Sequence, residues 1–167
     1  TKMTEKSRCI YPAVTGYLKQ EGLLDPVPWA LVDSRWTGSL QKSLQHLLNT
    51  MGYGGKAEGY YFGMYEYPGG ADRDTYHCWY FGPGNGLRRK TYFSNNLFEC
   101  IFSSPEGMTV GYEKRGEAYS PVLEKRWNPN RDKIVKTTEY LRQYAEELAE
   151  TLGKKFLFCP EQDKKRR

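Results

Sequence analysis

The chain has 167 residues, of which 38% are hydrophobic and 27% are charged, so it is long enough to bury a core as one folded domain. The formal net charge of +5 does not indicate a nucleic-acid-binding surface, because residues 164–167 carry four of the 25 basic side chains and leave 21 against 20 acidic ones. We therefore expect one domain over residues 1–163, a basic tail over residues 164–167, and no nucleic-acid partner.

Neither a membrane span nor a cysteine-based metal site is expected. No hydrophobic run approaches the ~20 residues that a membrane-spanning helix needs. The four cysteines are far apart and form no CxxC pair, which argues against a zinc ribbon or a thiol oxidoreductase. Because no signal-peptide pattern is found, we expect reduced cysteines and a cytoplasmic location. Residue 1 is Thr rather than Met, so we expect a piece of a longer protein.

The first third of the sequence predicts a helix, a strand and a second helix. Pro12 can begin a short helix that runs to residue 19 and ends near Gly22. Residues 29–33 (WALVD) form a short apolar run, which predicts a buried strand. The second helix follows a loop and ends at Gly52. Its single apolar stripe consists of Leu40, Leu44, Leu47, Leu48 and Met51.

The remaining two thirds alternate strand and helix patterns. Aromatic residues supply 15% of the chain, and most of them fall in the predicted strands. The predicted elements are strands over 57–67 and 75–81, a loop over 82–90, a short helix from about 94, a hairpin of 108–112 with 117–123, a helix from 130 to about 152, and an edge strand over 155–159. We therefore predict a single α/β domain with a mixed sheet, flanking helices, a Rossmann-like strand–loop–helix near the N-terminus and a long C-terminal helix.

The stretch between the first predicted strand and the second helix is the main candidate for a binding site. An acidic residue, Asp33, ends the strand just before the helix, which is where open α/β sheets place ligands. The unpaired N–H groups at a helix start suit a phosphate or a carboxylate. The residues that we assign to this site are Asp33, Arg35, Trp36, Thr37, Gly38 and Ser39.

These residue types fit an anionic ligand that also carries hydroxyl groups. Asp33 is expected to hold the hydroxyls or a metal ion, and Arg35 to bind phosphate together with the loop amides. Trp36 offers a ring face, and Gly38 lets a ligand approach the backbone closely. We therefore expect a phosphorylated sugar or nucleotide as the ligand, with no evident cofactor other than a possible Mg²⁺.

An alternative interpretation of the same stretch needs no ligand. Thr37 or Ser39 is then the N-cap of the helix, because their hydroxyls can accept a hydrogen bond from its first N–H groups. Asp33 then pairs with Arg35. The sequence leaves both interpretations open.

Asn95, Asn96 and Glu99 form a second candidate, since the two asparagine amides, with Glu99 beside them, can bind a sugar. The spacing of Asn96 and Glu99 is equally that of a capping box. His77 and Cys78 cannot form a nucleophilic pair, because neighbours on a strand point to opposite faces. No HExxH, GxGxxG or GxxxxGK[ST] motif occurs, so the catalytic residues are unknown and no metal ligands are assigned.

Residues 31–39 (LVDSRWTGS) share an acid, a Thr-Gly pair and a hydroxyl residue with the loops of phosphoribosyltransferases. Ser34 stands where those loops carry a second acid, and the loop is one residue shorter. This resemblance implies, as an alternative function, an Mg²⁺-dependent transferase that acts on a sugar or ribose phosphate. Asp33 would be its essential carboxylate.

Three longer segments, VDSRWTGSLQKSL (32–44), GYYFGMYE (59–66) and YFSNNLFECIFSSPEGMTVGY (92–112), resemble another group of proteins. They are similar to the C-terminal region of bacterial predicted haloacid-dehalogenase-type hydrolases associated with cell-surface polysaccharide and glycosyltransferase loci. That family has Asp-Ile-Gly-Trp where this chain has Asp33, Ser34, Arg35 and Trp36. The Asp-x-Asp-x-Thr nucleophile motif of such hydrolases is absent from this sequence.

The resemblance, which covers residues 17–112, implies an accessory region next to a hydrolase domain or subunit. We expect the chain to bind a phosphorylated sugar or nucleotide in surface-glycan metabolism. Two alternatives remain, the transferase described above and a structural module that docks the hydrolase domain through its tyrosine-rich surface.

Overall fold

A computed structural model of the protein describes residues 2–125 and 128–152. The α/β class predicted from the sequence is confirmed, since helices are combined with a parallel sheet and a small antiparallel sheet. The predicted edge strand over 155–159, the end of the last helix at Gly153 and the basic tail lie outside the described residues. The chain divides into two compact units, Thr1–Asn95 with Met108–Lys125, and Asn96–Gly107 with Arg126–Arg167.

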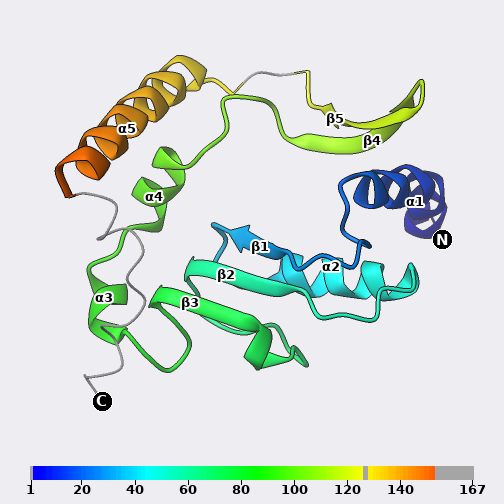
Figure 1. Cartoon of the computed structure of the whole chain (residues 1–167), viewed down its shortest axis with the longest axis horizontal. Helices are drawn as coiled ribbons and strands as arrows, with labels where there is room; N and C mark the ends of the chain where they lie inside the picture. Colours follow the sequence, from blue (N-terminus) through cyan, green and yellow to red (C-terminus); the bar gives the residue numbers. More distant parts are fainter. Residues whose placement is uncertain (1, 126–127, 153–167) are drawn as a thin grey trace. The chain divides into compact units, whose positions relative to one another are not determined.

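The parallel sheet of the first unit consists of three strands that lie side by side in chain order (Figure 1). Strand β1 (Ala30–Asp33) pairs with β2 (Glu58–Gly63), and β2 pairs with β3 (Tyr76–Phe81). The predicted combination of parallel and antiparallel pairs is thus divided between two sheets, because the antiparallel pair is a separate hairpin. β2 ends at Gly63, earlier than the predicted residue 67.

Both connections within this sheet run over the same face. Helix α2 (Ser39–Thr50) joins β1 to β2, and residues 64–75 with the short 3₁₀ helix η1 (Arg73–Thr75) join β2 to β3. The Lys42 ammonium donates a hydrogen bond to the Gly69 carbonyl, which links the two connections. Crossovers between parallel strands are right-handed, so successive crossovers in one direction must share one side of the sheet.

The core of the first unit lies between this face of the sheet and α2, which passes behind β2 in Figure 1. Leu48 of α2 is fully buried, and the stacked rings of Tyr61 and Tyr76, with centroids 5.9 Å apart, are also buried. Met64 and Phe81 complete the set of large buried hydrophobic side chains at the carboxyl ends of the strands. Leu40, predicted to face the core, is 50% exposed, and Gln41 is buried instead.

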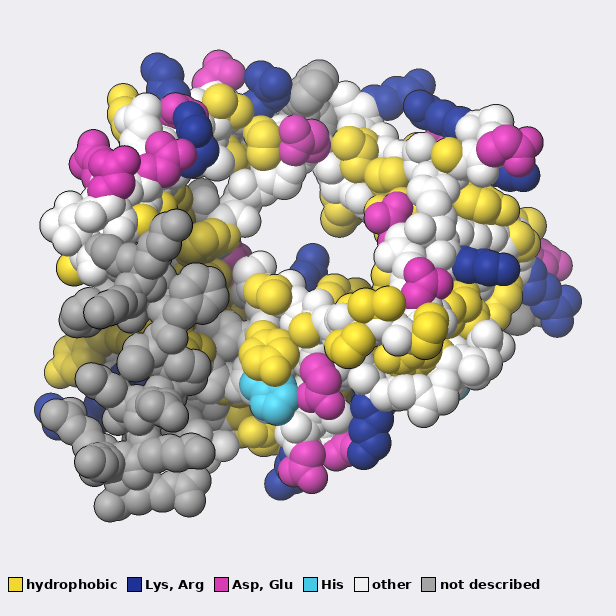
Figure 2. Space-filling view, in the orientation of Figure 1, with side chains coloured by type: hydrophobic (Ala, Val, Ile, Leu, Met, Phe, Trp, Pro, Cys, Tyr) yellow, Lys and Arg dark blue, Asp and Glu magenta, His cyan; other side chains and the backbone are white. Residues whose placement is uncertain are grey.

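The opposite face of the sheet is not covered by any helix of the first unit. Val32 is 82% exposed, Trp79 75% and Tyr60 49%. Figure 2 shows hydrophobic side chains gathered over β1 and β2 on the side turned to the viewer. The prediction that residues 29–33 form a buried strand is therefore wrong for this face, because β1 is an edge strand with Asp33 turned inward and Val32 outward.

Helix α1 (Lys2–Gln20) packs against the hairpin of β4 (Thr109–Arg115) and β5 (Ala118–Leu123). The Gln20 side chain donates to the Tyr119 carbonyl at 3.0 Å and accepts the Tyr119 N–H at 2.6 Å, like one more strand residue. The prediction that Pro12 begins this helix is wrong, because ten helical residues precede Pro12. The Thr15 hydroxyl donates to the carbonyl groups of Tyr11 and Pro12, within the turn that follows the proline.

Two short helices follow β3. The residues predicted as a loop over 82–90 contain a tight turn, with a bridge between Gly82 and Asn85, and then helix α3 (Leu87–Thr91). Arg89 on α3 donates to the Tyr80 carbonyl at 3.2 Å, which holds this helix at the end of β3. Helix α4 (Asn95–Ile101) begins where the sequence predicts it.

The second unit contains the long helix α5 (Arg131–Leu152), which confirms the predicted helix. Ile134 is its one buried residue, and the other residues of its apolar stripe are exposed in the described structure. These exposed residues are Leu141, Tyr144, Leu148 and Leu152. No helix within residues 2–125 and 128–152 combines the length and hydrophobicity that crossing a membrane requires.

We expect Gly59→Ala to destabilise the protein by about 1–3 kcal/mol, because a β-carbon at this position would collide with the buried Gln41 amide. Gly111→Ala is the matched control, since it also lies in a strand and an added β-carbon meets no atom within 4 Å. Urea unfolding measures both changes, and the control should stay within about 0.5 kcal/mol of wild type. Equal effects at the two positions would contradict the packing at Gly59.

Candidate functional site

The loop at residues 33–39 begins with a carboxylate that the strand turns into the protein. Asp33 is 9% exposed and lies opposite Tyr61 in the register of β1 and β2. One carboxylate oxygen, Oδ1, accepts the Arg35 backbone N–H at 2.9 Å. The other, Oδ2, is buried and has no hydrogen-bond partner among the described residues. A buried carboxylate oxygen without a donor is costly, so Oδ2 of Asp33 is an exception among the buried polar groups of the described residues.

The buried Tyr61 ring beside Asp33 keeps its hydroxyl proton. Burial, with a smaller effect from the Asp33 charge, raises the pKa of Tyr61 well above its ordinary value. This hydroxyl donates to the Gln41 Oε1 atom at 2.8 Å and not to Asp33. The Tyr61 hydroxyl beside the Asp33 carboxylate is therefore neutral, and its proton is already donated to Gln41.

Helix α2 starts without a side-chain cap. Its N-cap is Gly38, in the left-handed conformation with φ 62°, and no side chain of the described residues caps the helix. The interpretation that Thr37 or Ser39 is the N-cap is therefore wrong; the Thr37 hydroxyl instead donates to the Ser39 hydroxyl at 3.3 Å. The first N–H groups of α2 are left to solvent or to a bound anion.

The absence of a side chain at Gly38 has a packing reason as well as a conformational one. A β-carbon there would lie 2.6 Å from Tyr76 Cε1 and 2.8 Å from Met64 Cε. The glycine thus lets the start of α2 sit directly on the core. Close packing of the protein itself accounts for this residue, alongside any approach of a ligand.

Arg35 is exposed, and its link to Asp33 runs through the main chain. Among the described residues, no ion pair joins its guanidinium group to Asp33. The alternative in which Asp33 pairs with Arg35 thus holds for the backbone N–H only. The guanidinium group remains available for an anion at the loop.

Trp36 packs within the protein. Its ring stacks on Phe81 with an interplanar angle of 10° and meets Phe93 edge-on at 5.2 Å. Its carbonyl accepts the Tyr65 N–H at 2.9 Å. The Tyr65 hydroxyl donates to the side-chain oxygen of Asn95, so the structure brings Asn95 to the same edge of the sheet as Trp36. The half-buried Trp36 ring anchors the loop.

Asn96 and Glu99 lie in the second unit and are exposed. Helix α4 begins at Asn95, so Asn96 belongs to its first turn and is not its N-cap. The capping-box interpretation of Asn96 and Glu99 is therefore wrong. Both residues lie on the part of α4 that belongs to the second unit, whereas the loop at 33–39 belongs to the first unit.

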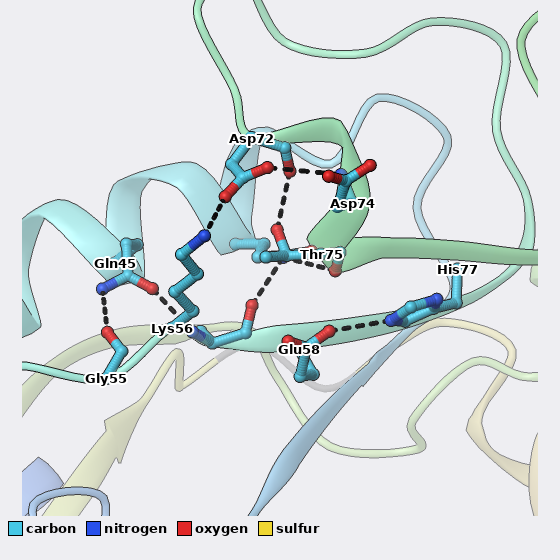
Figure 3. Close-up of polar contacts among 10 residues, drawn as sticks. Gln45, Gly55, Lys56, Glu58, Asp72, Asp74, Thr75 and His77 are labelled. Atoms are coloured by element: carbon cyan, nitrogen blue, oxygen red, sulfur yellow. Dashed lines mark hydrogen bonds and ion pairs between the residues drawn. The ribbon is translucent and has the colours of Figure 1, made fainter.

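The remaining candidates give no catalytic group. His77 and Cys78 are neighbours on β3 and point to opposite faces of the sheet. His77 forms a 2.7 Å contact with the Glu58 carboxylate (Figure 3). Its ring also stacks on Tyr60. Burial raises the pKa of the Cys78 thiol, which disfavours the nucleophilic thiolate. Within the described part of the chain, no group of three or more His, Cys, Asp or Glu residues could hold a metal ion.

A polar network at the amino ends of β2 and β3 was not predicted from the sequence. The buried Gln41 amide donates to the Ala57 carbonyl at 2.7 Å and to the Thr75 carbonyl at 2.9 Å. One turn later on α2, the Gln45 amide donates to the Gly55 carbonyl at 3.0 Å and accepts the Ala57 N–H at 2.6 Å (Figure 3). The two glutamines fix the loops that precede β2 and β3. In the sequence they look like ordinary polar positions beside a leucine stripe.

No protein-family model matches the chain, and no curated protein sequence matches it.

We expect Gln41→Leu to lower the free energy of unfolding by more than about 3 kcal/mol. The substitution keeps the volume but leaves several buried groups without a partner, each at a cost of about 1–3 kcal/mol. Ser43→Ala, at an exposed position of the same helix, is the control and should change stability by less than about 0.5 kcal/mol. Urea unfolding with circular dichroism measures both; near-equal values would show that the buried amide is dispensable.

Proposed function

We propose that this chain is a binding module that takes a phosphorylated sugar or nucleotide at the loop 33–39. The observation that carries the proposal is the buried, unpartnered Oδ2 atom of Asp33 beside a helix start that has no side-chain cap. The carboxylate oxygen needs a donor, and the helix start favours an anion. A ligand with both a hydroxyl and a phosphate group supplies both.

The contacts of the loop suggest a division of roles. Asp33 Oδ2 accepts a ligand hydroxyl, and the exposed Arg35 guanidinium binds the phosphate together with the first N–H groups of α2. Trp36 and Asn95 hold the loop in place through Tyr65. One carboxylate with a ligand phosphate is also a common way to bind Mg²⁺, so the ion is included in the test.

The biological setting of the proposal comes from the sequence resemblance. The resemblance implies a role in the cytoplasm of a bacterium, beside a hydrolase domain or subunit and in surface-glycan metabolism. Because the Asp-x-Asp-x-Thr motif does not occur in the sequence, we assign ligand binding to this chain and no phosphoryl transfer by the haloacid-dehalogenase mechanism.

A thermal-melt screen with sugar phosphates and nucleotides, with and without Mg²⁺, tests the site. A ligand at 100 times its dissociation constant should add about 2.7 kcal/mol of stability, which is a shift of several degrees. Asp33→Asn removes the acceptor at Oδ2 and Arg35→Ala removes the cation, so each should abolish most of the shift.

Glu117→Gln is the matched control, because Glu117 is an exposed acid in the turn between β4 and β5. It should leave the ligand-induced shift unchanged. If the thermal shift persists in both Asp33→Asn and Arg35→Ala, the ligand binds elsewhere on the chain. If no phosphate compound gives a shift, the proposal is rejected.

The face of the sheet that no described helix of the first unit covers favours a second function, docking of the hydrolase domain. Parallel sheets are normally covered on both faces. Here the exposed Val32, Tyr60 and Trp79 side chains form an apolar surface. The basic residues Arg88 and Arg89 on α3 follow β3 and are exposed, so the surface suits a helix with an apolar face and acidic neighbours.

Trp79→Lys tests this second function. The substitution should leave the stability of the isolated chain within about 0.5 kcal/mol of wild type, because Trp79 is exposed. It should abolish the stabilisation that an added hydrolase domain gives to the wild-type chain. Tyr140→Lys, an exposed aromatic position on α5, is the control and should retain that stabilisation. Severe destabilisation of the isolated chain by Trp79→Lys would show that the chain itself covers this face.

A further inference from the structure

A cavity of about 430 Å³ lies at the amino ends of the strands, on the α2 side of the sheet. This volume is in the range of small-molecule sites. One wall is the polar side of α2, and the other consists of the loop before β2 and the loop before β3. Gly54 and Gly70 line the cavity, and a β-carbon added at either position meets no atom within 4 Å.

The side-chain oxygen atoms around this cavity are already used within the protein. The Gln45 oxygen accepts the Ala57 N–H at 2.6 Å, and the Asn49 oxygen accepts the Gln45 amide at 2.7 Å. The Asp72 carboxylate forms a 2.6 Å ion pair with Lys56 and also accepts the Asp74 N–H (Figure 3). A ligand that enters the cavity therefore meets few free acceptors.

The donors are in excess. Lys42 and Lys56 each carry three N–H bonds, of which one is used, by the Gly69 carbonyl and by Asp72 respectively. Asn49 and His46 also line the cavity, and neither the Asn49 amide nitrogen nor the His46 ring has a hydrogen-bond partner among the described residues. Lys42, His46 and Asn49 follow each other at i, i+4 and i+7, so they lie along one side of α2.

We infer that this cavity binds a small oxyanion, a phosphate or a carboxylate, with Lys42 as its main anchor. The Lys56 charge is balanced by Asp72, whose pKa is lowered by its hydrogen bond to Lys56, so this pair contributes less net attraction than Lys42. The cavity lies at the amino ends of the strands, whereas Asp33 lies at the carboxyl end of β1. The inference does not depend on the function proposed for the loop 33–39.

Titration with inorganic phosphate, followed by ¹H–¹⁵N NMR, tests the inference. Backbone signals of Gln45, Asn49, Gly54 and Gly70 should shift together and saturate. Lys42→Gln should weaken binding about tenfold, which is typical of a lost charge-assisted hydrogen bond, while Lys42→Arg should largely restore it. Lys19→Gln, an exposed lysine of α1, is the matched control and should bind like wild type.

Asp72→Asn should change the phosphate affinity in the opposite direction to Lys42→Gln. It removes the carboxylate that lines the cavity and releases Lys56, so phosphate should bind more tightly. Asp33→Asn should leave phosphate binding at this cavity unchanged, which separates this inference from the proposal for the loop. Equal affinities in wild type, Lys42→Gln and Asp72→Asn, or shifts spread over unrelated lysines, would overturn the inference.

Discussion

The buried amide of Gln41 is the interaction on which the first unit depends. It lies on α2 but bonds to the chain just before β2 and just before β3, and it also accepts the Tyr61 hydroxyl within β2. An apolar side chain there could hold α2 against the sheet but could not fix its position along the sheet, whereas hydrogen bonds have direction and length. The rotation and register of α2 therefore follow from one residue, and so do the positions of its N-terminus and of its polar side.

The order of the strands has a second consequence for the molecule. Three parallel strands in chain order, joined by crossovers of one hand, place both connections on one face. In larger α/β sheets a reversal of strand order brings helices to the second face, and ligands bind at that reversal. The described sheet has no reversal. The surfaces that we propose as functional lie at the two ends of its strands and on one face.

Most helices and strands could be predicted from local sequence patterns, whereas the start of α1, helix α3 and the packing of the elements could not. The leucine spacing of α2, the glycine near residue 22 and the hairpin of β4 and β5 are local patterns, and the structure has them close to the predicted positions. The predicted helix start at Pro12 was wrong because a proline begins helices more often than it lies within one. The predicted burial of Val32 was wrong because an apolar strand residue gives the same sequence pattern whether or not a helix covers it. The polar side of α2 could not be recognised, since the partners of Gln41 and Gln45 are distant in sequence. For the loop 33–39, the residue types suggested a binding site. The packing of the Trp36 ring and the glycine N-cap could not be predicted, because they depend on tertiary contacts.

The missing side chain at Gly59 links two positions that are far apart in the sequence. The Gln41 amide occupies the space that a β-carbon of residue 59 would need. Neither position can therefore vary independently: a larger residue at 59 is compatible only with a shorter side chain at 41, and the amide is compatible only with glycine. In a set of related sequences the two positions should covary, and an evolutionary path that changes residue 59 first must pass through a destabilised intermediate.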